Sequence, residues 1–343
     1  MPMKKYIILL LICALCLCAC ETKVDIPSDG KEAMLIMDGI LNSGSIHHQI
    51  ILIESNAKSG IIKAKPCRLD IYINDELACS ADEFRQKGRK CIYDFDAVFS
   101  PGDKVKISTY YEGEEVWTES LVPEAPVLSD IILGNEISAT YKEWGNSSTR
   151  DFWEIYVEIS DPEGCGNAYM ISEVRTTAEC ECIKDKEETP DFNRKGEIEN
   201  HEESKSIYTF MDPSFQMPGI PDDYKDPQYS LFDDRLFDGK KYRVLLLSDT
   251  DPEYKPSYGY VSFGETWEYR NTITVKISAV SPETFRYFSA VEYDGASDLI
   301  PIAHAPTHYP CNINGGLGYV AVCSSATLSK PLPPAVWKGD GAD

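Results

Sequence analysis

The sequence predicts a mainly β protein, in which an N-terminal immunoglobulin-like β-sandwich precedes a larger β-rich domain with one or two short helices. Apolar and polar residues alternate over residues 69–73, 105–109 and 153–159, and a period of two is the signature of half-buried strands. Turn residues such as Asn74-Asp75 follow, as expected between antiparallel strands. Apolar residues make up 43% of the chain, so it can form packed cores.

The N-terminus has the pattern of an export signal. Lysines near the start precede an apolar run over residues 6–17, which is too short to span a bilayer as a helix and matches the apolar part of a signal peptide. Ala19 stands directly before Cys20, which resembles the lipobox of bacterial lipoproteins. We therefore predict a signal peptide over residues 1–19 and a lipid on the Cys20 thiol. A cysteine-rich ordinary signal peptide is the alternative.

The rest of the chain divides by composition. Residues 20–32 are polar and are predicted to form a tether, and residues 33–122 hold the short strands of the sandwich. Prolines predict a stiff linker over residues 123–130. The remaining predicted parts are a β-rich domain at residues 131–330 with a helix starting at Ser281-Pro282, a charged insertion at residues 181–206, and a flexible tail at residues 331–343.

Charge and motifs argue against several classes of function. The formal net charge is −23, so a phosphate backbone would be repelled and we expect no nucleic-acid partner. The chain has no Gly-x-Ser-x-Gly elbow and no phosphate-binding glycine loop. We therefore expect no catalytic residues and no cofactor.

The candidate metal ligands also fail as motifs. His304 and His308 are four residues apart, but the prolines around them disfavour the helix that would place both on one metal. Residues 249–253 imitate the start of an EF-hand loop, but Tyr254 occupies the position that needs glycine. We expect no metal site of these types, and a looser calcium site stays open.

Eight cysteines follow Cys20, and an even number permits disulfides in an exported protein. A hairpin centred on Leu317 would place Cys311 opposite Cys323, and flanking glycines would supply its tight turn. This pair is the first candidate disulfide. The other candidates are Cys79 with Cys91 as a weaker disulfide, and Cys165, Cys180 and Cys182 as disulfide partners, free thiols or ligands of a soft metal.

One proline-rich segment, residues 211–234, keeps several aromatic residues. Proline lowers the entropy lost when a loop becomes ordered, and aromatic side chains supply large contact areas. We expect this segment to be a partner-binding loop; the alternative is that its rings hold the loop against its own domain. The candidate contact residues are Phe215, Tyr224, Tyr229 and Phe232.

Several short motifs occur in a fixed order along the chain. They are Met37-Asp38-Gly39, Asp161-Pro162, residues 236–242, Ser281-Pro282-Glu283 and residues 312–318. Together with the lipobox they resemble the Bacteroidota lipoproteins grouped as domain of unknown function family 4249. The resemblance implies a β-rich outer-membrane lipoprotein, often encoded beside a TonB-dependent receptor, and it implies no catalytic residue.

These features predict a non-enzymatic lipoprotein held on the outer membrane by its lipid, with the face of that membrane left open. Its expected role is to capture an unidentified ligand or to serve as an accessory subunit of a TonB-dependent transporter. An envelope hydrolase with an unrecognised site and an adhesive or structural surface module are the alternatives.

Overall fold

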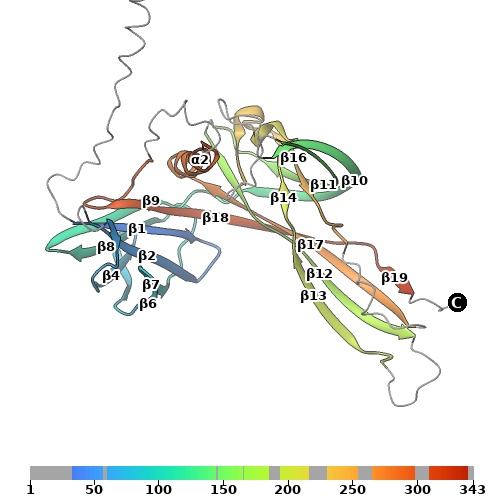
Figure 1. Cartoon of the computed structure of the whole chain (residues 1–343), viewed down its shortest axis with the longest axis horizontal. Coiled ribbons are helices and arrows are strands. Elements are labelled where there is room, and N and C mark those ends of the chain that lie inside the picture. Colours follow the sequence, from blue (N-terminus) through green and yellow to red (C-terminus); the bar gives the residue numbers. More distant parts are fainter. Residues whose placement is uncertain are drawn as a thin grey trace, which may run out of the picture.

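The computed structural model describes residues 33–56, 60–143, 146–164, 166–184, 194–215, 230–253, 265–297 and 309–338. In these ranges the chain is mainly β, and its strands form three sheets. Figure 1 shows two groups of strands along the long axis, with helix α2 (Pro282–Ser297) near their junction. Within the described residues, no helix has the length and apolar character needed to cross a membrane.

The N-terminal half consists of two sheets that enclose one core. Its strands are β1 (Ala33–Asn42), β2 (His47–Asn56), β3 (Gly60–Ile62), β4 (Leu69–Ile73), β5 (Glu76–Ala81), β6 (Arg85–Lys87), β7 (Lys90–Asp96), β8 (Lys104–Tyr111) and β9 (Glu114–Leu121). Strands β1, β2 and β7 lie side by side in the first sheet, and the second has the order β5-β4-β8-β9. Leu35 and Met37 of β1 share a core with Ile71 and Ile107 of the second sheet.

The C-terminal half is built from longer strands. They are β10 (Val127–Glu143), β11 (Asn146–Ser160), β12 (Ala168–Lys184), β13 (Ile198–Ser204), β14 (Ile207–Tyr208), β15 (Ser230–Asp233), β16 (Lys241–Ser248), β17 (Thr266–Val280), β18 (Leu317–Pro331) and β19 (Ala335–Lys338), with 3-10 turns η1 (Pro213–Phe215) and η2 (Asp234–Leu236). The sheet β10-β11-β16-β14 packs against β12 and β17. Ile155 and Val157 meet Ile273 and Val275 in this second core.

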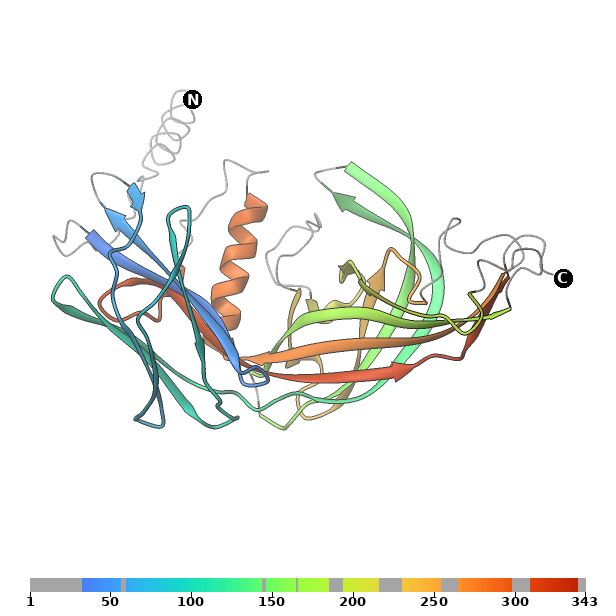
Figure 2. The same ribbon diagram turned by 90° about the horizontal axis from the view of Figure 1, so that it is seen from below.

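Strand β18 joins the two halves. Its first part pairs in parallel with β1, from Ile36 opposite Leu317 to Asn42 opposite Cys323. Its second part pairs antiparallel with β17, from Val280 opposite Cys323 to Thr272 opposite Pro331. Figure 2 shows β18 running from beside β1 into the long strands of the C-terminal half. The large sheet is therefore continuous through both halves.

Glycines allow the segment before β18 to lie between the two N-terminal sheets. Asn314 pairs with Trp117 of β9, with N–O distances of 2.7 and 3.1 Å. Gly318 has φ of 100°, and a Cβ there would collide with the carbonyl oxygen of Met37. A Cβ on Gly316 would lie 2.7 Å from the carbonyl oxygen of Leu35. Only glycine allows the backbones to approach this closely.

The hairpin predicted around Leu317 is therefore not formed. Leu317 is the first residue of β18 and faces Ile36 of β1 in a parallel pair. A hairpin turn and a close backbone approach both require glycine, so the flanking glycines could not distinguish them.

Two segments predicted to lack regular structure contain strands. In the charged insertion at 181–206, β12 extends to Lys184 and β13 pairs antiparallel with β12. In the predicted tail, β19 pairs with β17 and places Trp337 opposite Trp267. Along β13 the half-buried positions are Glu199, His201 and Glu203, and they alternate with exposed residues, so high charge did not exclude a strand at a sheet edge.

The linker is shorter than predicted, and the core of the N-terminal half includes residues from the far end of the chain. Strand β10 already begins at Val127, inside the predicted linker 123–130. The core of residues 33–122 also contains Ile313, Val320 and Val322. The helix predicted at Ser281 is present, and the Ser281 hydroxyl accepts a hydrogen bond from the Thr284 backbone N–H at 3.1 Å.

Candidate functional site

A cavity of about 580 Å³ lies at the junction of the two halves. The end of β9 and the linker after it contribute Leu121, Pro123 and Pro126. The C-terminal half contributes residues from the turn after β11, the start of β12, the end of β17, the first turn of α2 and β18. Segments far apart in the sequence therefore build this cavity together.

Prolines give the cavity a rigid rim. Pro123, Pro126, Pro162 and Pro282 line it, each from a turn or a strand end. Proline fixes φ, so these segments lose little conformational freedom when a partner binds. The cavity is therefore largely formed before any ligand arrives.

Two buried tyrosines form part of the wall. Tyr319 of β18 stacks on Tyr287 of α2 with ring centroids 4.3 Å apart, and its hydroxyl lies 3.1 Å from the Thr284 hydroxyl. The Tyr169 hydroxyl donates a hydrogen bond to Asp161. Burial raises the pKa of both tyrosines, so each remains a protonated hydrogen-bond donor at neutral pH.

The charge of the rim is negative. Among the described residues that line the cavity, the ionisable carboxylates are Glu119, Glu124 and Glu283, and none is Lys, Arg or His. Glu283 pairs with Arg286 at 2.8 Å, and Glu119 lies 3.7 Å from Lys104. Glu124 is exposed and has no ion-pair partner in the described parts of the chain. The site thus suits an apolar group next to a positive charge.

A cluster of carboxylates lies beside this cavity. Asp161, Asp234 and Asp238 each offer an oxygen within 4.8 Å of the others. Each of the three carboxylates also accepts a hydrogen bond from a backbone N–H at 2.9 Å. The donors are Gly239 for Asp161, Asn167 for Asp234 and Gly164 for Asp238. The turn after β11 donates to Asp234 and Asp238 and also lines the cavity, through Gly166 and Asn167.

Electrostatics in this cluster favour either a proton or a cation. Burial raises the pKa of Asp234, the backbone N–H of Asn167 offsets part of this rise, and the charges of Asp161 and Asp238 raise it further. Converging carboxylate oxygens are the ligands that Ca²⁺ and Mg²⁺ prefer. The hydrogen bonds to backbone groups also hold the turns together without an ion.

Comparison with known proteins identifies the family. A family model described as a domain of unknown function (DUF4249) matches residues 21–329. The chain belongs to the DUF4249 family. No curated protein matches it. In this DUF4249 protein, two of the motifs that carried the family resemblance meet in space, because Ile159 of β11 pairs with Tyr242 of β16 and Asp161 donates its N–H to Lys240.

Two of the four aromatic residues predicted to contact a partner, Phe215 and Phe232, lie within the described part of the DUF4249 protein. Phe232 is fully buried in β15, and its ring lies 5.0 Å from Phe215 and 5.2 Å from Tyr169. Phe215 packs against the same core. Phe232 is therefore not exposed as a contact surface requires, and the packing of both rings matches the alternative, in which they hold the segment against its own domain. Tyr224 and Tyr229 lie outside the described residues.

The cysteines of the candidate disulfides are free thiols in the structure. The Cys323 thiol donates to the Leu41 carbonyl at 3.3 Å, whereas the Cys311 thiol lies 3.7 Å from the Ile313 carbonyl. Cys79 and Cys91 belong to different sheets, since β5 pairs with β4 and β7 pairs with β2. Neither predicted pair therefore has the arrangement that the sequence suggested: Cys79 and Cys91 are not on neighbouring strands of one sheet, and no hairpin centred on Leu317 joins Cys311 to Cys323.

Other predicted residues are placed as follows. Cys180 and Cys182 are buried beside Trp267 and Tyr269. The acidic residues at 249–253 follow the end of β16, where Glu253 donates its N–H to Asp251 at 2.9 Å. Cys20, Cys165, His304 and His308 lie outside the described residues.

The sequence analysis missed the junction cavity and the role of Asp234. Asp161 and Asp238 belong to two turn motifs that lie 77 positions apart in the sequence. The sequence signal that could have found Asp234 is the pair Asp233-Asp234 shortly before Phe237-Asp238-Gly239. Asp233 caps the 3-10 turn η2, and Asp234 is its buried first residue. Nothing in the sequence indicated that it would meet the turn after β11.

Proposed function

We propose that this DUF4249 protein is a lipid-anchored, non-enzymatic envelope lipoprotein of the outer membrane and that it acts as an accessory subunit of a TonB-dependent transporter. Its partner-binding site is the junction cavity, which takes an apolar segment with an adjacent basic residue. The proposal includes a Bacteroidota origin and an immunoglobulin-like sandwich at residues 33–122. Two facing sheets in that region support the second point.

The observation that carries the proposal is the junction cavity itself. Its volume of about 580 Å³ suits a small group of side chains. Its rim is rigid and negative, as described above, and Leu121 beside it is 64% exposed. An exposed apolar residue at a preformed cavity supports a protein partner. The lipobox before Cys20 supports a location at the membrane.

The anchor is tested by Cys20→Ala. We expect this variant to lose metabolic labelling with palmitate and to leave the membrane fraction, because no other residue can carry the lipid. Normal labelling of the variant would contradict the anchor. This result leaves the partner site untouched, so the two parts of the proposal can fail separately.

The partner site is tested with Ala125→Trp, which places a large ring in the cavity. Val127→Trp is the matched control, because Val127 is 59% exposed and does not line the cavity. The readout is co-purification with a TonB-dependent receptor of the same cell, from detergent-solubilised membranes. We expect Ala125→Trp to reduce recovery of the receptor at least tenfold and Val127→Trp to leave it unchanged. Equal recovery with both variants, at normal protein abundance, would exclude the cavity.

A further inference from the structure

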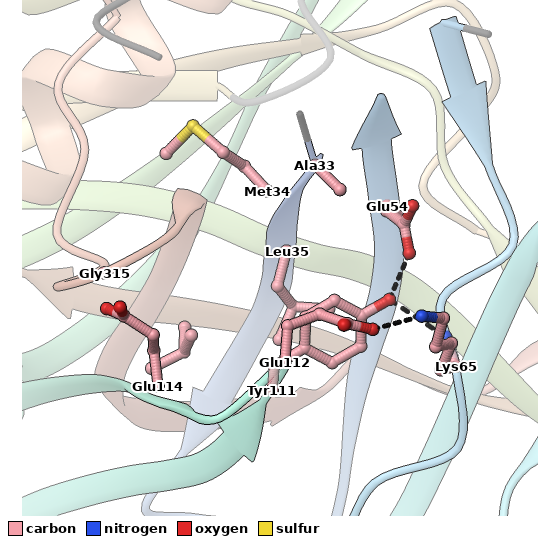
Figure 3. Close-up of a pocket in the computed structure, with 10 residues that line it drawn as sticks. Ala33, Met34, Leu35, Glu54, Lys65, Tyr111, Glu112, Glu114 and Gly315 are labelled. Atoms are coloured by element: carbon pink, nitrogen blue, oxygen red, sulfur yellow. Dashed lines mark hydrogen bonds and ion pairs between the residues drawn. The ribbon is translucent and has the colours of Figure 1, made fainter. Parts of the chain in front are cut away.

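A second pocket, of about 440 Å³, opens at the end of the N-terminal half where β1 begins. Ala33, Met34 and Leu35 of β1 line it together with residues of β2, β8, β9 and the segment before β18. Figure 3 shows Glu54, Tyr111 and Lys65 hydrogen-bonded at one side of the pocket, with Met34 and Glu114 at the other. It contains none of the residues of the junction cavity.

Glu54 is an ionisable residue at a core-facing position. It lies opposite Leu35, which is 1% exposed, and Glu54 itself is only 4% exposed. Residues at such positions are normally apolar, because a charge loses its hydration there. A glutamate here therefore needs a partner that replaces the hydrogen bonds of its lost hydration water.

The known partners of Glu54 satisfy only one of its oxygens. The Tyr111 hydroxyl donates to Oε2 of Glu54 and accepts the backbone N–H of Lys65 at 3.0 Å. Burial and the neighbouring Glu54 raise the pKa of Tyr111, so the hydroxyl remains a donor. Within the described residues, Oε1 of Glu54 has no hydrogen-bond partner and the carboxylate has no ion pair.

The nearby cation is already engaged. The Lys65 ammonium forms an ion pair with Glu112, and this hydrogen bond raises the pKa of Lys65. Lys65 and Glu112 together carry no net charge. The charge of Glu54 also raises the pKa of Lys65, but the hydrogen bond of the ammonium goes to Glu112, so Oε1 of Glu54 can still accept a hydrogen bond from a ligand.

We propose that this pocket binds an alkylammonium group, such as the side chain of a lysine from a peptide or protein. The ammonium pairs with the Glu54 carboxylate, and its alkyl chain packs on Met34, Leu35 and Val116, which line the pocket. In the described residues, three metal-ligand groups within 4.8 Å of one another occur at Asp161, Asp234 and Asp238 and not here. An extended organic cation therefore fits this pocket better than a metal ion does.

The proposal is tested by isothermal titration calorimetry on the full chain in detergent, with two probes that share a four-carbon side chain and differ in its terminal ammonium. N-acetyl-lysine methylamide carries the ammonium, and N-acetyl-norleucine methylamide lacks it. We expect the lysine probe to bind at least tenfold more tightly. Glu54→Gln keeps an oxygen for the Tyr111 hydroxyl but removes the charge, and we expect it to abolish this preference.

A matched control separates the site from general attraction by an acidic protein. Glu115→Gln removes one negative charge from β9, where Glu115 pairs with Lys106 at 3.3 Å outside the pocket. We expect it to bind the lysine probe as the natural chain does. An equal loss in Glu115→Gln and Glu54→Gln would overturn the proposal, as would full binding by Glu54→Gln.

If circular dichroism shows that Glu54→Gln does not fold, a second variant tests the role of Glu54. Glu54→Asp keeps the charge but withdraws it from the pocket by one methylene. We expect at least a threefold weaker affinity for the lysine probe and an unchanged affinity for the norleucine probe. Unchanged affinity for both probes would reject the role of Glu54.

Discussion

Asp234 is a single residue whose ionised form is unfavourable in the folded protein. It is 3% exposed and shares its surroundings with two other carboxylates. Burial and these charges raise its pKa in the folded protein, whereas the unfolded chain has the ordinary value. The folded state therefore binds this proton more tightly than the unfolded state does.

This difference predicts a pH dependence. The stability contributed by the Asp234 proton is fully present below the ordinary pKa of 3.8 and is lost as the pH rises through the raised value in the folded protein. We expect Asp234→Asn, which keeps an acceptor oxygen, to lack this contribution. Urea unfolding from pH 4 to pH 7 should show the natural chain losing stability relative to the variant as the pH rises. Parallel curves for the two proteins would contradict the assignment.

Individual residues also mark the limit of sequence analysis. The composition around Phe215 and Phe232 suggested an exposed loop, because proline and aspartate surround both rings. Phe232 is buried by contacts with Tyr169 and Phe237, and Phe215 packs on Phe232; these contacts are formed only in the folded chain. Local composition contains no information about such contacts.

At the scale of elements, the close approach of residues 314–318 to β1 and β9 depends on glycines. We expect Gly318→Ala to destabilise the protein by about 3 kcal/mol or more, because its Cβ meets the backbone of Met37 and the positive φ is itself unfavourable. Gly102→Ala is the matched control, since Gly102 has φ of 85° but no atom within 4 Å of the added Cβ. Its cost should be about 1 kcal/mol.

The two glycine variants are compared by their free energies of unfolding in urea. Equal losses would show that φ alone matters and that the segment is not tightly packed against β1. A larger loss in Gly318→Ala supports the close approach. The comparison also bears on the hairpin that the sequence predicted, because a surface turn would give both variants similar costs.

Strands could be predicted because the alternation of apolar and polar residues is a local property of the sequence. In β4 and β11 this alternation matches strands that pair with a neighbour in the sequence, β5 and β10 respectively. The parallel pairing of β1 with β18 could not. It joins Ile36 to Leu317, and no turn or local period specifies a partner so distant. The helix α2 could be predicted, because its cap lies within its own sequence.

At the scale of the whole molecule, the N-terminal half needs residues from the C-terminal end. We expect a fragment of residues 33–122 to be less stable alone than with a peptide of residues 309–325 added, because Ile313, Val320 and Val322 complete its core. At a peptide concentration of 100 times Kd, the gain should be about 2.7 kcal/mol. Thermal unfolding of the fragment with and without peptide measures it. A midpoint that does not respond to the peptide would show that residues 33–122 fold as a self-sufficient domain.

The parallel pairing of β1 with β18 also sets an order of events during synthesis. The N-terminal strands leave the ribosome first, but the neighbour of β1 is made almost three hundred residues later, between Leu317 and Cys323. Until then the Ile36–Asn42 edge has unpaired backbone groups, which attract other strands. Such long-range pairing slows folding. A chain with this topology has to be kept from aggregating until its last strands are available, which makes it a natural client of chaperones.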